Sequence, residues 1–377
     1  NCRMGVETRR LLKKNKNSPP VFSHEFVIQN HGDISSVILM IIFLAFMWQG
    51  TTHIAAVFVI PQYNETVNAT IPGTTTQYSY DVWRAGIRDV FTVLFYTVAC
   101  VTVHAIIQEY VIDKLVRKAC RDNKLSISKT KGVKLNESGQ LIIFWAYTLA
   151  HAVYILGETF TQYNDLQKLW TNYPIEHRGL SLRAKFFFII QLSYWLHQFP
   201  EFYLQKYKSD ECRARTLPTI VNIVAITVAY ALNFNRLATV IIAIEAVLGV
   251  IFHSARILHF IEMKTYASKL FKLWNLLFVL GHSLEAAISA IVFWHGLKLT
   301  EVPYIDWIEG NFNTTTVRLN CLIGVFVLQA YFFLSFARFH YGRIAESWSK
   351  KTKKTTPVVH KTKKRDEEVK EDSKKDN

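Results

Sequence analysis

The sequence predicts an all-α membrane protein, a bundle of about eight transmembrane helices. The first observation is that apolar residues in the 377-residue chain gather in blocks of roughly 16–27 residues, and blocks of that length cross a hydrocarbon core about 30 Å thick. The second is that Lys and Arg concentrate in alternate connecting segments. Together they exclude the soluble, multidomain protein that a chain of this length would otherwise suggest.

Eight apolar blocks define the transmembrane domain, which we place at residues 34–337. The predicted spans are residues 34–60, 90–107, 141–157, 184–204, 219–233, 237–258, 273–296 and 319–337. Only residues 233–236 join the fifth and sixth, which predicts a tight helical hairpin. A short segment, residues 1–33, precedes the domain. Residues 338–377 form a basic tail, which is predicted to be disordered because its charged end cannot bury a core.

The distribution of positive charge predicts the orientation. An even number of spans puts both termini on one side, together with 34 of the 44 Lys and Arg residues, whereas nine lie on the other side. The positive-inside rule therefore places both termini in the cytosol. The first span is expected to act as an uncleaved signal anchor, because no apolar run precedes it. None of the five cysteines falls in a lumenal segment, so no disulfide framework is expected.

Two kinds of short signal suggest a glycoprotein of the endoplasmic reticulum. Asn68 and Asn64 begin glycosylation sequons in the first lumenal loop, and Asn313 begins a less suitable one close to the last span. The sequon at Asn136 lies in a predicted cytosolic loop and should stay unmodified. Lys374 and Lys375 stand fourth and third from the C-terminus, as in di-lysine retrieval signals. The alternative for that pair is a solvated run of charge.

Glu245, His282 and Glu285 are the candidate polar residues at membrane depth. Glu245 lies about eight residues from either end of its apolar block, where a carboxyl group is costly unless it faces a pocket or a partner. His282 and Glu285 are three residues apart, so they share a helix face. The pair could be an acid/base pair, half of a metal site, a buried hydrogen-bonded pair or the lining of a polar groove. Most other ionisable residues lie near helix ends, where the long ones can reach the interface.

The sequence contains no catalytic or cofactor-binding motif of the common soluble enzymes. There is no phosphate-binding loop, dinucleotide fingerprint, Gly-x-Ser-x-Gly elbow or His-Glu-x-x-His helix. We therefore expect no cofactor and no enzymatic activity.

Several short strings resemble one family. They are SPPVFSHEFV at 18–27, PQYN at 61–64, HAIIQEY at 104–110, NESGQ at 136–140, QLSYWLH at 191–197, FPE at 199–201 and GNFN at 310–313. Their order and spacing against eight spans are similar to those of the translocating chain-associated membrane (TRAM) proteins. The resemblance runs from about Ser18 to Trp348.

This resemblance implies a multi-pass protein of the endoplasmic reticulum that assists the Sec protein-conducting channel. Its partners would be the channel itself and nascent signal sequences and transmembrane segments, above all those with weak signals. The basic cytosolic segments could also contact the ribosome or anionic lipid. The family belongs to the TRAM–LAG1–CLN8 group, whose TLC domain would cover roughly residues 108–345.

The same group includes ceramide synthases, which raises a lipid acyltransferase as an alternative. Tyr230, Asn233 and Arg236 resemble a stretch of those enzymes. Measured from this stretch, the paired histidines of a synthase would fall on Pro218 and Thr219. Neither histidine is present.

The later catalytic positions of a synthase are also changed. Its His-Asp pair and the following Asp would fall on Glu245, Ala246 and Gly249. None of those residue types is present, so the general base and its orienting carboxylate are missing. A lipid-binding or transport protein that uses the same groove is the remaining alternative.

Overall fold

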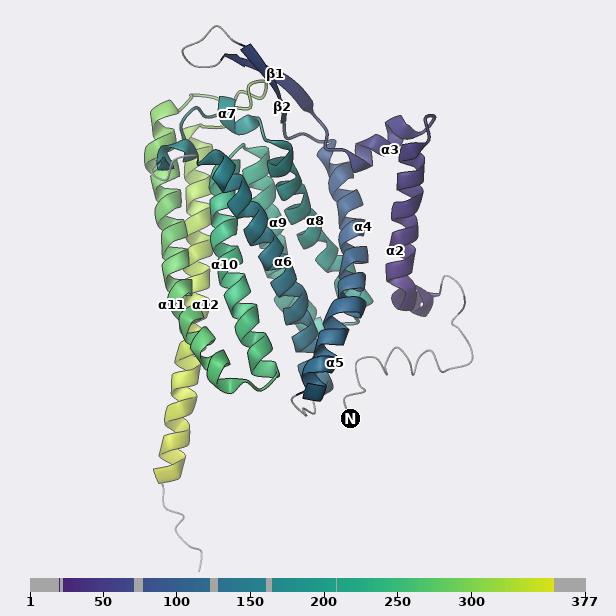
Figure 1. The fold of residues 1–377 in the computed structure, drawn as a ribbon. Helices are drawn as coiled ribbons and strands as arrows, with labels where there is room; N and C mark the ends of the chain where they lie inside the picture. Colours follow the sequence, from purple (N-terminus) through teal and green to yellow (C-terminus); the bar gives the residue numbers. More distant parts are fainter. Residues whose placement is uncertain are drawn as a thin grey trace, which may run out of the picture. The chain divides into compact units, whose positions relative to one another are not determined.

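A computed structural model describes residue 20 and residues 23–70, 77–122, 128–160, 165–207 and 209–355. Long helices dominate this part of the chain (Figure 1). They are α2 (His24–Met47), α4 (Asp89–Ile106), α6 (Lys129–Thr159), α8 (Leu182–Leu204), α9 (Ser209–Ala231), α10 (Asn235–Phe260), α11 (Lys264–Ala290) and α12 (Thr315–Thr355). The described residues form two compact units that divide after residue 325, within α12.

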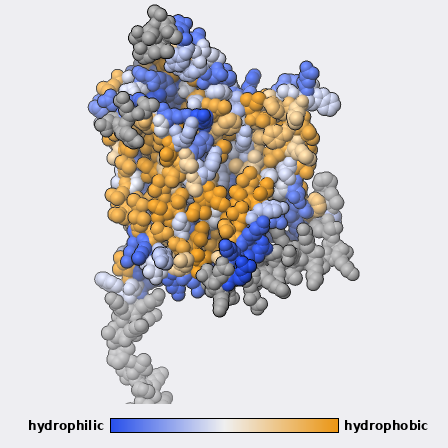
Figure 2. Space-filling view, viewed as in Figure 1, coloured by the Kyte–Doolittle hydropathy of each residue, from blue (hydrophilic) through white to orange (hydrophobic). Residues whose placement is uncertain are grey.

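Within the described residues, seven helices are long and apolar enough to cross a membrane, and α8 is the remaining long helix. Helix α8 carries Lys185, His197 and Glu201 among its buried residues. Because it is packed inside the protein, its side chains need not be soluble in lipid. The prediction of an all-α, multi-pass membrane protein is confirmed, and Figure 2 shows a hydrophobic band over the flank of the bundle.

The first predicted span, residues 34–60, consists of two helices. Helix α2 begins at His24, where the Ser23 hydroxyl accepts a hydrogen bond from the Phe26 amide at 3.2 Å and caps the helix. It ends at Met47, and α3 (Thr52–Val59) follows after a turn. The Thr51 and Thr52 hydroxyls donate to carbonyls of the last turn of α2, which satisfies groups that a helix end leaves unpaired.

An antiparallel β-hairpin occupies the predicted first lumenal loop. Strand β1 (Asn64–Thr70) pairs with β2 (Gln77–Trp83) in a register that sets Asn64 opposite Trp83. The end of the bundle on which this hairpin stands is called the hairpin end below (Figure 1). An isolated bridge between Trp83 and Leu180 joins the hairpin to the segment before α8.

The predicted loop between the second and third spans is largely helical. A π-helical turn, η1 (Ile107–Ile112), continues α4, and α5 (Asp113–Asp122) follows it. Helix α6 already begins at Lys129, so Asn136 lies inside a helix and the predicted third span is only the second half of α6. The short elements elsewhere are η2 (Leu166–Leu169), α7 (Ile175–Arg178), η3 (Ile291–Gly296) and η4 (Leu297–Thr300).

The tight connection between α9 and α10 is confirmed. Helix α9 ends at Ala231 and α10 begins at Asn235, and Asn233 between them adopts a left-handed backbone with φ of 59°. Asparagine tolerates this conformation better than most residues do. Its side-chain amide donates to the carbonyl oxygen of Gly310 at 2.9 Å. Gly310 has a φ of 65°, and a Cβ there would lie 2.9 Å from that amide, so glycine fits the position.

Candidate functional site

The three residues predicted at membrane depth form one cluster between α10 and α11. His282 Nδ1 lies 3.3 Å from Glu285 Oε2 and 3.7 Å from Glu245 Oε1. Gly281 favours the close approach of the two helices, because a Cβ there would lie 3.2 Å from Ile244 and Leu248. The side chains of His282 and Glu285 are buried, and that of Glu245 is 31% exposed. Two carboxylates thus converge on one ring nitrogen, and only Glu245 reaches the surface.

A second polar cluster joins α4 and α8, and it was not predicted from the sequence. His104 Nδ1 lies 3.3 Å from His197 Nε2, and His104 Nε2 lies 3.3 Å from Glu201 Oε1. His197 and Glu201 are almost completely buried. Their positions near helix ends suggested contact with the interface, whereas the fold turns them towards each other.

This second cluster borders a polar cavity of about 170 Å³, large enough for several water molecules. Its polar lining includes Gln108, Asn136 and Gln140, and the Gln140 amide donates to His104 O at 3.1 Å. The family resemblance described above rests partly on residues 104–110, 136–140 and 191–201, and all three segments line this cavity. The sequence therefore held one signal for the second cluster: short strings that mark a family can lie in separate helices and still meet at one site.

The hydrogen bonds of the second cluster fix the donor at one of its ends. His197 Nδ1 contacts the Tyr194 carbonyl oxygen, which can only accept, so that nitrogen donates. The Gln205 side-chain amide donates to Glu201 Oε1 at 2.6 Å, the same oxygen that His104 Nε2 approaches. The two imidazoles and the carboxyl group thus form one continuous polar chain between α4 and α8.

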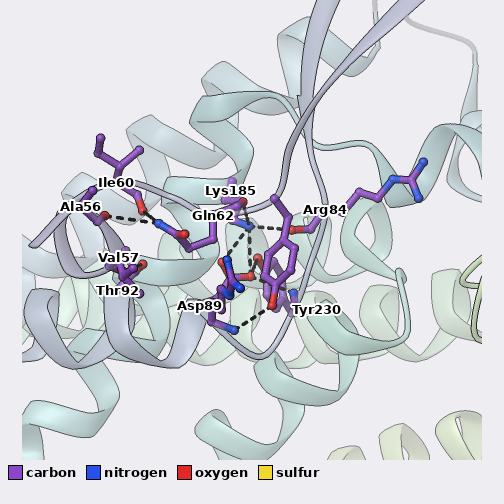
Figure 3. Close-up of polar contacts among 12 residues, drawn as sticks. Ala56, Val57, Ile60, Gln62, Arg84, Asp89, Thr92, Lys185 and Tyr230 are labelled. Atoms are coloured by element: carbon purple, nitrogen blue, oxygen red, sulfur yellow. Dashed lines mark hydrogen bonds and ion pairs between the residues drawn. The ribbon is translucent and has the colours of Figure 1, made fainter. Parts of the chain in front are cut away.

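A third network holds the hairpin end together (Figure 3). The Lys185 ammonium group donates to the carbonyl oxygens of Gln62 and Arg84, at 2.7 and 2.6 Å, and lies 2.8 Å from Asp89 Oδ1. The Tyr230 hydroxyl donates to Asp89 Oδ2 at 2.8 Å. Helices α4, α8 and α9 and both ends of the hairpin thus share one buried ion pair.

The three glycosylation candidates differ in their surroundings. Asn64 and Asn68 are exposed on β1, where Asn68 Oδ1 accepts a hydrogen bond from the Ser79 hydroxyl at 2.8 Å. Asn313 is fully buried, and its Nδ2 donates to Leu297 O at 2.6 Å. A glycan on Asn313 would occupy the nitrogen that makes this internal bond. Lys374 and Lys375, the predicted retrieval signal, lie outside the described residues.

Comparison with known proteins identifies the family. The TLC domain of the TRAM–LAG1–CLN8 group matches residues 134–338. The chain is 33% identical to translocating chain-associated membrane protein 2 of Mus musculus over 343 residues, which are 91% of this chain and 88% of that protein. Identity to the Homo sapiens protein of that name is 32%, with the same coverage. The chain belongs to the TRAM family.

A more distant relative of this TRAM protein is an enzyme. Ceramide Synthase FUM18 of Gibberella moniliformis is 21% identical over 199 residues, which are 52% of this chain and 44% of that protein. In the TRAM chain, Tyr230, Asn233 and Arg236, which resemble a stretch of ceramide synthases, make bonds that hold the hairpin end. Arg236 donates to Lys168 O at 2.7 Å and pairs with Glu176 at 3.1 Å.

Three of the positions where the resemblance places the catalytic residues of a synthase, 219, 246 and 249, are closely packed. Thr219 is buried, and its hydroxyl donates to Arg215 O at 2.8 Å. Ala246 is completely buried. A Cβ at Gly249 would lie 2.6 Å from the Trp145 ring. Larger acid or base side chains at 246 and 249 would therefore displace the contact between α10 and α6.

Substitution of Gly249 tests this packing. We expect Gly249→Ala to destabilise the protein by about 1–3 kcal/mol, because the added methyl group overpacks the contact with Trp145. Gly157→Ala in α6 is the matched control, since nothing lies within 4 Å of a Cβ there. It should gain roughly 0.5–1 kcal/mol of helix propensity. Thermal unfolding of both variants in one detergent measures the difference, and equal midpoints would refute the close contact.

Proposed function

We propose that this TRAM protein is an accessory of the protein-conducting channel of the endoplasmic reticulum. It would assist the translocation or membrane insertion of nascent chains whose signals are weakly apolar. The observation that carries the proposal is the 33% identity, over 91% of the chain, to a protein named for its association with translocating chains. We infer no covalent chemistry, and the loss of the synthase residues at 218, 219, 246 and 249 supports this.

The flank of the bundle offers a physical means of assistance. Leu276, Leu280 and Leu284 form an exposed apolar stripe on α11, and Glu245 of the adjoining α10 is partly exposed. A charged residue at the centre of a transmembrane segment costs about 2.5–3.5 kcal/mol in lipid. Contact with a protein surface that is apolar but includes a polar group would lower this cost. A weakly apolar segment could therefore stay in the membrane beside the channel instead of leaving it.

Reconstitution tests the proposed role. Proteoliposomes with the Sec channel would be prepared with and without the TRAM protein, and each would translocate one secretory precursor with either a weak or a strong signal. We expect the TRAM protein to raise the yield several-fold for the weak signal and to leave the strong signal unchanged. A photoreactive residue in the weak signal should also form adducts with the TRAM protein. Equal yields for the weak signal with and without it would refute the proposal.

The orientation and modification of the chain belong to the same proposal. Both termini would lie in the cytosol and the β-hairpin in the lumen, with Asn68 and then Asn64 as glycan acceptors. The exposure of both residues on β1 supports this order over the buried Asn313. Ribosome and anionic lipid remain proposed partners of the basic segments.

A further inference from the structure

The cluster of Glu245, His282 and Glu285 has the shape of a metal site. Each residue offers one ligand atom, and the three atoms lie within 4.8 Å of one another. Zinc binds imidazole nitrogen and carboxylate oxygen at about 2.0–2.2 Å, so two ligands of a tetrahedral ion lie roughly 3.3–3.6 Å apart. The distances from His282 Nδ1 to the two carboxylate oxygens are 3.3 and 3.7 Å. Two edges of the cluster thus nearly match those of a coordination tetrahedron.

The direction of the carboxylates favours a cation between them. Both approach the same ring nitrogen, and one Nδ1–H can be directed well towards only one acceptor. An ion at the point where the three atoms converge would contact all of them. The ring of His282 is held by an edge-on contact with Phe278, with centroids 4.2 Å apart. This contact fixes the direction in which Nδ1 points.

The charge of the three side chains also favours a divalent cation at this position. Glu245 and Glu285 carry two negative charges when ionised, and a protonated His282 would neutralise only one of them. Two negative charges close together at membrane depth are costly to bury, and a cation placed between them lowers that cost. A divalent ion with a neutral imidazole brings the net charge of the cluster to zero.

We propose that Glu245, His282 and Glu285 bind one divalent transition-metal ion, with zinc the best match to one nitrogen and two oxygen ligands. The ion would join α10 to α11 through side chains of both helices. Three protein ligands leave a fourth position of a tetrahedral ion for a further ligand. This proposal does not depend on the role of the protein at the channel.

Metal analysis of the purified full-length chain tests the site. The protein in mild detergent would be stripped with a chelator, dialysed against zinc and measured for metal content by mass spectrometry. We expect one zinc per chain and a higher unfolding midpoint than in the stripped protein. Glu245→Gln, Glu285→Gln and His282→Gln should each lower the zinc content at least tenfold at limiting zinc. His253→Gln is the matched control, because His253 is also a buried histidine, lies in α10 and is not part of the cluster.

Cobalt provides a readout that needs no variant to fold. Cobalt added to the stripped wild-type protein should give the intense visible absorption of a tetrahedral ion, and equimolar zinc should abolish it. Wild-type protein that retains no zinc and shows no such spectrum would overturn the proposal, and its carboxylates would then be neutralised by protons. Zinc bound equally by the wild type and all three cluster variants would also overturn it, because the ion would sit elsewhere.

Discussion

Lys185→Met is expected to lower the free energy of unfolding by about 3–5 kcal/mol. The substitution removes the cation of a buried ion pair and leaves the Asp89 carboxylate in a low-dielectric site, and breaking one side of such a pair typically costs this much. The Lys185 side chain is 0% exposed, so water cannot replace it. The carbonyl oxygens of Gln62 and Arg84 also lose their hydrogen bonds.

Two further variants separate the charge from the packing. Lys185→Met/Asp89→Asn should recover part of the loss, because the uncompensated charge is gone and the amide oxygen introduced at position 89 can still accept from Tyr230. Lys131→Met is the surface control: its ion pair with Glu262 is half exposed and should be worth less than about 1 kcal/mol. Unfolding in one detergent, followed by loss of the monodisperse peak, measures all three. A loss for Lys185→Met no larger than that for Lys131→Met would contradict the prediction.

The candidate residues Glu245, His282 and Glu285 show what spacing in the sequence can indicate. Glu245, His282 and Glu285 could be selected because each interrupts an apolar block, and the helical period alone places the last two on one face. The α9–α10 turn could be predicted because only four residues separate two apolar runs. Such features depend on spacing along one helix or between neighbouring helices, and spacing is visible in the sequence.

Contacts between distant segments could not be predicted in the same way. His104 and His197 are 93 residues apart, and each stands near the end of an apolar block. The position of either histidine near the membrane interface explains it without a partner, so the sequence pattern gives no reason to expect a contact between the two. The apolar stretch of α8 predicts a membrane span, whereas the burial of α8 depends on the helices that pack around it. The hairpin was missed because β1 is polar and its pairing with β2 satisfies the backbone rather than a hydrophobic core.

Acidification is expected to weaken the hairpin end through His177. This histidine lies in α7, outside the membrane-spanning helices, and is 2% exposed. Burial, with a further contribution from the positive charge of Arg236, lowers the pKa of His177 to about 4. The Thr171 carbonyl oxygen and the Glu176 carboxylate oppose this shift. The structure therefore holds the imidazole neutral at pH values where an unfolded chain, with a histidine pKa of about 6.5, would protonate it.

The sign of the effect follows from proton binding. Below about pH 6.5 the unfolded chain takes up a proton that the folded chain excludes, so the free energy of unfolding falls with pH until about pH 4. At 1.36 kcal/mol for each pKa unit, the full loss approaches ~3 kcal/mol. His177→Gln keeps a donor for the Thr171 carbonyl oxygen, which lies 3.0 Å from Nε2, but cannot protonate. Unfolding midpoints of both proteins from pH 7 to 5 isolate His177, because the other titrating groups are common to them. Parallel curves would contradict the prediction, whereas a wild-type midpoint that falls faster would show that neutral His177 stabilises the hairpin end.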